Sequence, residues 1–227
     1  MSKTLFRLAT ASALLLAFGA AKADLTFYTS QASFMSQLSN SATDSYSDLS
    51  ANVGHDMNTP LTRAVGGFGY GLFAYNMAAN DYDTIFVGGP SGNPAISTSY
   101  SASILIVDRM TGGANAFGAY FWGASSGDAI QNARINFEVL DAAGVDKTFT
   151  FTTTGNQSGF IGVTSNTTLK VVNAWIDLDG LSGSAPFVTM DNATLGVTAP
   201  VPEPANYALM LGGLAALGAV VRRRKAN

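Results

Sequence analysis

Alternation of apolar and polar residues with a period of two most constrains what this chain can fold into. In the stretch 133–140, Ile135 and Phe137 alternate with polar residues, and Phe149 alternates with threonines after a turn. Successive side chains of a β-strand point to opposite faces, so each arm has one buried face and one wet face. The glycine-containing turn 141–144 joins the two arms, and the whole stretch predicts a β-hairpin.

Short β-prone runs, separated by glycine pairs and Asn/Asp clusters, fill the rest of the middle of the chain. One short helix is expected at Ser30–Leu38, with Ser30 as its cap. We therefore expect an all-β fold of about nine strands, a two-sheet sandwich of the jelly-roll type. Besides the hairpin, the expected strands are 69–75, 84–87, 103–107, 117–122, 160–163, 168–178, 187–190 and 193–197.

The first 23 residues follow the three-part pattern of a secretory signal peptide. Lys3 and Arg7 provide the positive start, 8–18 is the apolar run, and Ala21 and Ala23 occupy the two positions that signal peptidase requires. The apolar run is too short to span a bilayer. We therefore expect a signal-peptide helix, export through Sec-type machinery, and cleavage by signal peptidase.

A second apolar segment lies near the other end of the chain. Residues 205–221 carry no charge, and at 1.5 Å per residue they would form a helix about 25 Å long, enough for a thin bilayer core. A basic cluster follows and would stay in the cytoplasm by the positive-inside rule, which agrees with an exported domain at 24–200. This cluster consists of Arg222, Arg223, Arg224 and Lys225. We expect a transmembrane helix at about 205–221.

The residues before this segment complete a tail of known type. Val201, Pro202, Glu203 and Pro204 precede the Gly/Ala/Leu-rich segment and the arginine cluster. The region 201–227 resembles the PEP-CTERM sorting signal of exopolysaccharide-producing Gram-negative bacteria. The resemblance implies an inner-membrane-anchored precursor with its domain in the periplasm. An exosortase would process it near Pro202-Glu203-Pro204 for delivery to the cell surface or extracellular matrix.

Charge and cysteine content exclude several classes of function. The segment 24–200 holds 14 acidic and five basic residues, so we expect no nucleic-acid partner, because phosphate backbones need a basic face. The chain has no cysteine, which removes disulfides, thiolate catalysis and cysteine-ligated zinc.

Signals of catalysis are weak. The segment 123–127 matches a nucleophile elbow, but that motif needs a later histidine, and the single histidine, His55, precedes it. His55 and Asp56 lie in a stretch that favours a surface loop. Glu138 is the only glutamate of the middle segment, whereas a glycosidase needs two facing carboxylates. We expect no enzyme.

Tryptophan supplies the clearest hint of a ligand. Trp175 shares one face of an expected strand with Asn173 and Asp177, while the opposite face is apolar. One indole among amides and carboxylates is typical of a sugar-stacking platform. Trp122, on one face with Tyr120, is a second candidate. The alternative is that both indoles pack beneath loops or at a sheet edge.

Calcium is the one cofactor that the sequence leaves open. Exported β-sandwiches often hold a structural ion with aspartates, and Asp177 and Asp179 are candidate ligands, although their spacing lacks the remaining EF-hand positions.

These observations favour a non-enzymatic surface or matrix protein associated with exopolysaccharide or biofilm. One alternative is a carbohydrate-binding module, with or without calcium. Another is a glycan hydrolase with an aspartate-based site.

Overall fold

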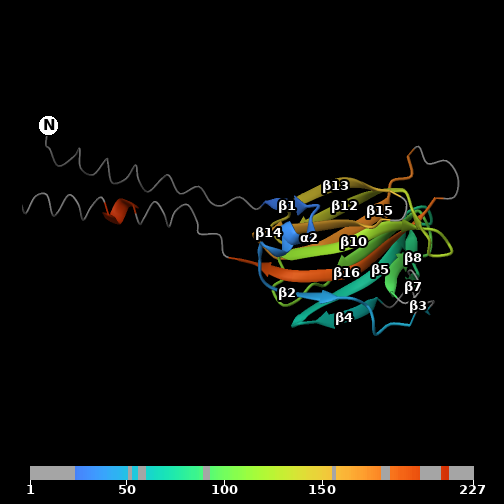
Figure 1. Ribbon diagram of the computed structural model, residues 1–227, viewed down its shortest axis with the longest axis horizontal. Helices are drawn as coiled ribbons and strands as arrows, with labels where there is room; N and C mark the ends of the chain where they lie inside the picture. Colours follow the sequence, from blue (N-terminus) through green and yellow to red (C-terminus); the bar gives the residue numbers. More distant parts are fainter. Residues whose placement is uncertain are drawn as a thin grey trace, which may run out of the picture. The chain divides into compact units, whose positions relative to one another are not determined.

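The strands of the computed structural model form two antiparallel sheets (Figure 1). The residues it describes are 24–50, 53–55, 60–88, 93–154, 157–179, 185–199 and 211–214. The strand pairs among them are all antiparallel, which confirms the predicted all-β class. The jelly-roll subclass stays a prediction.

One sheet has nine strands in the order β1-β14-β10-β16-β8-β7-β3, with β2 beside β16 and β11 beside β10. Their bounds are β1 Leu25–Tyr28, β2 Leu38–Asp44, β3 Val53–His55, β7 Ile85–Gly88, β8 Ala95–Thr98, β10 Ala116–Ala124, β11 Ile130–Gln131, β14 Gly159–Ser165 and β16 Phe187–Thr198. The central strand β16 pairs with β10 on one side and with β8 and β2 on the other.

The other sheet has seven strands in the order β13-β12-β15-β9-β5-β4, with β6 beside β5. Their bounds are β4 Leu61–Val65, β5 Phe68–Asn76, β6 Asp81–Asp83, β9 Ser103–Asp108, β12 Ala133–Asp141, β13 Asp146–Thr153 and β15 Leu169–Ile176. The predicted hairpin is β12–β13, in which Phe137 lies opposite Phe149 and Ile135 opposite Phe151.

The inner faces of the two sheets form one apolar core. Ile135 and Phe137 of β12 are fully buried, and Phe137 packs against Phe117 and Phe121 of β10 at ring distances of 6.4 and 5.6 Å. Each such side chain contributes roughly 1.5–3 kcal/mol when it is fully buried. The period of two in the sequence therefore specifies which face of β12 points inward.

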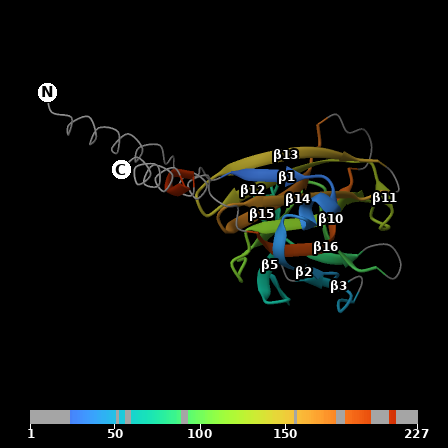
Figure 2. The same cartoon turned by 60° about the vertical axis from the view of Figure 1, so that its left-hand side comes forward.

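One lateral edge of the sandwich is closed by β1 and β13, which lie side by side in both views (Figures 1 and 2). The ring of Phe27 stacks on that of Phe149 at 5.4 Å. Lys147 of β13 donates a hydrogen bond to the Asp24 carboxylate at the start of β1 and another to the Leu25 carbonyl oxygen. The edge strands of the two sheets are thereby joined.

The one helix among the described residues of the sandwich, α2 (Gln31–Met35), packs on the outer face of the nine-stranded sheet. It begins where predicted, with the Ser30 hydroxyl accepting the N–H of Ser33. The expected end at Leu38 is wrong, because Leu38 already pairs in β2. Phe34 is fully buried against Gly118 and Gly162, where a Cβ would come within 2.9 and 2.6 Å of its ring.

The expected strand list is incomplete. It omits β1, β2, β3, β4, β6, β8 and β11, several of which are short or rich in Ser, Thr and Asn. It also divides β16 at Asn192, which is wrong. Asn192 has a φ of 53° and sits at a register shift opposite β10, so the strand continues through a β-bulge.

The described strands fall within one compact unit, Ala23–Ala199. Of the two chain ends, only residues 211–214 are described, and they are helical. No described helix has the length and apolar character needed to cross a membrane. The predicted cleavage residues Ala21 and Ala23, the motif 201–204, the cluster 222–225 and most of the 205–221 helix lie outside the described residues.

Candidate functional site

A strip of aromatic and aliphatic side chains crosses the outer face of the seven-stranded sheet. Tyr82 of β6 lies opposite Tyr75 of β5, which lies opposite Ile104 of β9. The pairing of Ala174 with Leu105 places Trp175 of β15 next to Ile104 in the same register. We call Trp175, Ile104, Tyr75 and Tyr82 the aromatic strip.

The strip is partly open to solvent. Tyr82 is 48% exposed, and Trp175, Tyr75 and Ile104 are half-buried. Tyr82 makes an edge-on ring contact with Tyr75 at 5.9 Å, and the Tyr75 hydroxyl donates to Asn80 at 2.8 Å. Since the solvent face of an antiparallel sheet is ordinarily polar, this strip is the candidate interaction surface of the seven-stranded sheet.

Polar groups line the strip along β12 and β15. The Asn173 side-chain amide donates to Glu138 at 2.7 Å, and its carbonyl oxygen is buried with no partner in the described part of the chain. Asn136, which lies opposite Trp175, accepts a hydrogen bond from Thr150 at 2.6 Å. Amide, carboxylate and hydroxyl groups therefore stand beside the exposed rings.

The two tryptophans that the sequence offers as sugar-stacking residues lie on different sheets. Trp175 and Asn173 share the outer face of the seven-stranded sheet, and Asp177 follows just beyond the end of β15. Trp122 belongs to β10 of the other sheet and is only 3% exposed, in a small cluster with Ala95. Of the two tryptophans, Trp175 is therefore the one that is partly exposed to solvent.

One of the two predicted calcium ligands, Asp177, already has partners in the protein. The Asp177 carboxylate lies 3.3 Å from Arg134 and accepts the backbone N–H of Asp179 at 3.1 Å. No group of three or more His, Cys, Asp or Glu side chains that could hold a metal occurs among the described residues. The calcium site stays a prediction.

The serine of the elbow-like segment serves a turn. The Ser125 hydroxyl accepts the backbone N–H groups of Gly127 and Ala129 between β10 and β11, each at 3.2 Å. His55 lies in β3, and Asp56 lies outside the described residues.

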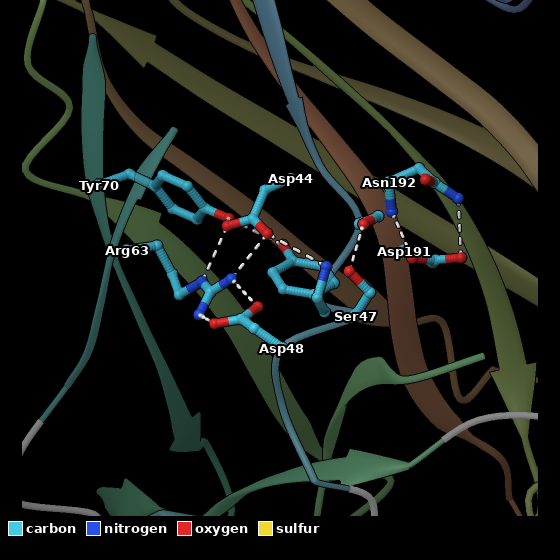
Figure 3. A network of polar contacts seen from close by, with 9 residues as sticks. Asp44, Ser47, Asp48, Arg63, Tyr70, Asp191 and Asn192 are labelled. Carbon is cyan, nitrogen blue, oxygen red and sulfur yellow. Dashed lines mark hydrogen bonds and ion pairs between the residues drawn. The ribbon is translucent and has the colours of Figure 1, made fainter. Parts of the chain in front are cut away.

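Sequence reasoning missed a polar network at the second lateral edge (Figure 3). Asp44 of β2 accepts hydrogen bonds from Arg63 of β4, the Tyr70 hydroxyl of β5 and the Tyr46 backbone N–H, all between 2.8 and 3.1 Å. Arg63 also binds Asp48 through both carboxylate oxygens, at 2.7 and 2.9 Å. No local sequence pattern indicates the network, because it joins residues of three strands.

Burial and hydrogen bonding oppose each other in this network. Burial alone would raise the pKa of Asp44, but hydrogen bonds from Arg63, Tyr70 and Tyr46 outweigh it and hold that pKa below 3.8. Burial also raises the pKa of Tyr46 and of Tyr70 above the ordinary value. The arginine is therefore paired with ionised carboxylates, and the edge is held by charge-assisted bonds.

The described fold is thus a two-sheet antiparallel β-protein with an exposed aromatic strip. Residues 200–225 match the PEP-CTERM protein-sorting motif. The match confirms the resemblance of the tail, and the motif implies an exported, membrane-anchored precursor that an exosortase processes. No curated protein matches the chain.

Several solved structures share a distant likeness. The CBM22-1–GH10 modules of Clostridium thermocellum endo-1,4-β-D-xylanase 10B match at 12% identity and a TM-score of 0.33, over 70% of this chain and 28% of that one. A CBM51-2 and INT structure of Clostridium perfringens ZmpB with GlcNAc matches at 14% and 0.35, over 71% and 32%. The CBM22-1 xylan-binding domain of Paenibacillus barcinonensis Xyn10C matches at 10% and 0.35, over 67% and 99%. This chain thus spans about a third of the first two.

Proposed function

We propose that this chain is a non-enzymatic, exported glycan-binding protein that associates with exopolysaccharide at the cell surface or in the extracellular matrix. The observation that carries the proposal is the aromatic strip, in which rings from three strands line up across an outer sheet face beside amide and carboxylate groups. Rings of this kind stack on the apolar faces of sugars, and the polar neighbours bind hydroxyls.

The length of the strip favours an extended chain over a single sugar. Neighbouring strands lie about 4.8 Å apart, so Trp175 and Tyr75, two strands apart, are separated by about 10 Å, and Tyr82 lies one strand further. A polysaccharide running across the strands would contact all three rings. Glu138 already accepts a hydrogen bond from Asn173, and Asp177 pairs with Arg134, which favours binding over hydrolysis.

In this proposal, the two ends of the chain direct the export of the domain. The signal peptide 1–23 directs Sec-type export and is removed after Ala23. The domain 24–200 then stands on the periplasmic side, held in the inner membrane by a helix at about 205–221 with Arg222–Lys225 in the cytoplasm. Exosortase processing near Val201–Pro204 releases or transfers the domain. Mass spectrometry of the C-terminal peptide of the exported protein would test this, because a mature protein that retains 222–225 would contradict processing.

The acidity of the domain narrows the glycan class. With 14 acidic and five basic residues in 24–200, it would repel an anionic polysaccharide unless calcium bridged the two. We therefore propose a neutral glycan for calcium-independent binding.

The test is co-sedimentation of the full chain, kept in a phosphocholine detergent that contains no sugar, with insoluble exopolysaccharide of the source organism. Parallel experiments in calcium and in EDTA distinguish direct binding of the polysaccharide from binding that requires calcium bridges. Trp175→Ala should lower binding about five- to 150-fold, if stacking of a sugar on the indole is worth the roughly 1–3 kcal/mol that stacking of a base on an aromatic ring contributes. Phe86→Ala is the matched control, because Phe86 is 40% exposed on β7 of the other sheet. Equal binding by both variants and the unmodified chain would contradict the proposal.

A further inference from the structure

A pocket of about 260 Å³ with both apolar and polar lining opens on the outer face of the nine-stranded sheet, on the opposite sheet from the aromatic strip. Tyr120 and Trp122 of β10 form one wall, and Asp191 and Asn192 of β16 form another. Asn93, which precedes β8, completes the polar lining together with Ser158, and Ile130 adds an apolar side chain.

The β-bulge in β16 creates this lining. In a regular strand, consecutive residues point to opposite faces, so Asp191 and Asn192 would not both reach one pocket. The register between β10 and β16 shifts between Gly118 and Tyr120, and Asn192 adopts a φ of 53°. Asparagine tolerates this left-handed conformation better than most residues. The bulge therefore places two consecutive polar side chains at the pocket.

Asp191 is a buried carboxylate held in one orientation. It is 3% exposed and accepts hydrogen bonds from the Asn93 side chain at 2.7 Å, the Asn192 side chain at 2.8 Å and the Asn192 backbone N–H at 2.6 Å. No described ion pair includes it. Burial raises its pKa, against the lowering effect of these bonds, and nearby Asp44 raises it further. Asp191 is therefore an acidic residue at a position where burial disfavours its charged form.

Trp122 leaves one polar group unmatched. Its indole N–H is buried and has no acceptor within the described residues, whereas the Tyr120 hydroxyl donates to Gln31 at 3.0 Å. A buried donor without a partner costs roughly 1–3 kcal/mol. A ligand oxygen admitted by a small shift of the indole would remove that cost.

The lining selects the chemistry of the occupant. None of the lining residues is basic, so an anion would meet only the charge of Asp191. A single carboxylate that already accepts three N–H groups is a poor metal site. Hydroxyl groups fit this lining, because they can donate to Asp191 and accept from the amides of Asn93 and Asn192.

The geometry points to a second binding site, in which Asp191, Asn93, Asn192 and the Trp122–Tyr120 wall hold one neutral sugar ring or the end of a glycan chain. The volume supports a single ring, since pockets for drug-sized ligands run from about 300 to 1,000 Å³. This site does not depend on the aromatic strip, which binds along a chain and lies on the other sheet.

The test is titration of the full chain, in the same sugar-free detergent, with glucose, galactose, mannose and N-acetylglucosamine, followed by saturation-transfer NMR and calorimetry. At least one sugar should bind. Asp191→Asn should weaken that binding about tenfold through loss of a charge-assisted hydrogen bond. Ser158→Trp should abolish it by filling the pocket from an exposed position that the fold does not need.

Trp175→Ala separates the two sites. It should reduce polysaccharide co-sedimentation and leave monosaccharide binding unchanged. The pocket is overturned if none of the four sugars binds, if EDTA abolishes binding, or if Trp175→Ala abolishes it while Ser158→Trp does not. Far-ultraviolet circular dichroism and urea unfolding of each variant check that the sandwich is intact.

Discussion

Asp44 and Arg63 face each other across the edge between the two sheets, with both carboxylate oxygens of Asp44 2.8 Å from guanidinium nitrogens of Arg63. Their side chains are only 6% and 12% exposed. Asp44 belongs to the nine-stranded sheet and Arg63 to the seven-stranded sheet, so this pair clamps the layers at the edge opposite the Phe27–Phe149 contact.

Removing the positive charge of Arg63 should destabilise the fold, because the buried Asp44 carboxylate then lacks its ion-pair partner. Arg63→Met leaves Asp44 buried without its main partner and should lower the free energy of unfolding by about 3–5 kcal/mol. Urea denaturation measures the change. Arg109→Met is the control. The Arg109 side chain is 60% exposed and pairs with Asp108 at 3.3 Å, so its replacement should lower the unfolding free energy by less than about 1 kcal/mol. Similar losses in both variants would contradict a buried clamp.

The clamp should also depend on pH. The folded-state pKa of Asp44 lies below its ordinary value of 3.8, so its stabilisation is complete above that value and is lost as pH falls through the folded pKa. The difference in unfolding free energy between the unmodified chain and Asp44→Asn should therefore shrink as the pH is lowered from about 6 to about 3. A difference that does not change with pH would argue against an ionised, clamped carboxylate.

Asp191 should show the opposite slope. Its folded-state pKa is raised above 3.8, so the folded state holds its proton more tightly than the unfolded state does. Relative to Asp191→Asn, the unmodified chain should lose stability as the pH rises from about 3 through the folded pKa. The sign of this slope, measured by urea denaturation at each pH, is the readout. A rising difference would mean that Asp191 is stabilised as an anion.

The contact of α2 with the sheet should not tolerate a methyl group. A Cβ at Gly162 would lie 2.6 Å from the ring of Phe34, which is fully buried and cannot move freely. Gly162→Ala should lower the unfolding free energy by about 1–3 kcal/mol through overpacking. Gly127→Ala is the control, since its nearest neighbour would lie 3.9 Å away. Thermal unfolding of both variants measures the loss of stability. If Gly162→Ala is as stable as the unmodified chain, α2 can shift to make room for the methyl group.

The aromatic strip should act as a series of rings. Tyr82→Ala and Tyr75→Ala should each weaken polysaccharide binding severalfold, and the double variant should weaken it more than either single change. Affinity electrophoresis in a gel containing the polysaccharide ranks the binding strengths of the two single variants and the double variant. Loss of binding in Trp175→Ala alone, with both tyrosine variants unaffected, would confine the site to the indole.

Much of the fold follows from local sequence. The alternation of Ile135 and Phe137 with polar residues identifies β12 and its inner face, and Ser30 identifies the start of α2. The polar strand β2 escapes prediction because its sequence, LSNSATD, has no apolar alternation, and its pairing with β16 depends on residues about 150 positions away.

The candidate sites are predictable only in part. The face that Trp175 shares with Asn173 follows from alternation within one strand. Its alignment with Tyr75 and Tyr82 depends on the pairing of β15, β9, β5 and β6, which no local pattern specifies. The pocket depends on the bulge at Asn192, and an asparagine within a strand is as compatible with the predicted break as with a bulge.

The position of β16 also bears on how the protein would resist force. A load applied at Ala199 along the axis of this strand would pull on 12 residues that pair with β10 on one side and with β8 and β2 on the other. Such a load shears many hydrogen bonds at once, whereas a load on an edge strand peels them one at a time. A sandwich loaded through β16 would therefore resist unfolding better than one loaded through an edge strand.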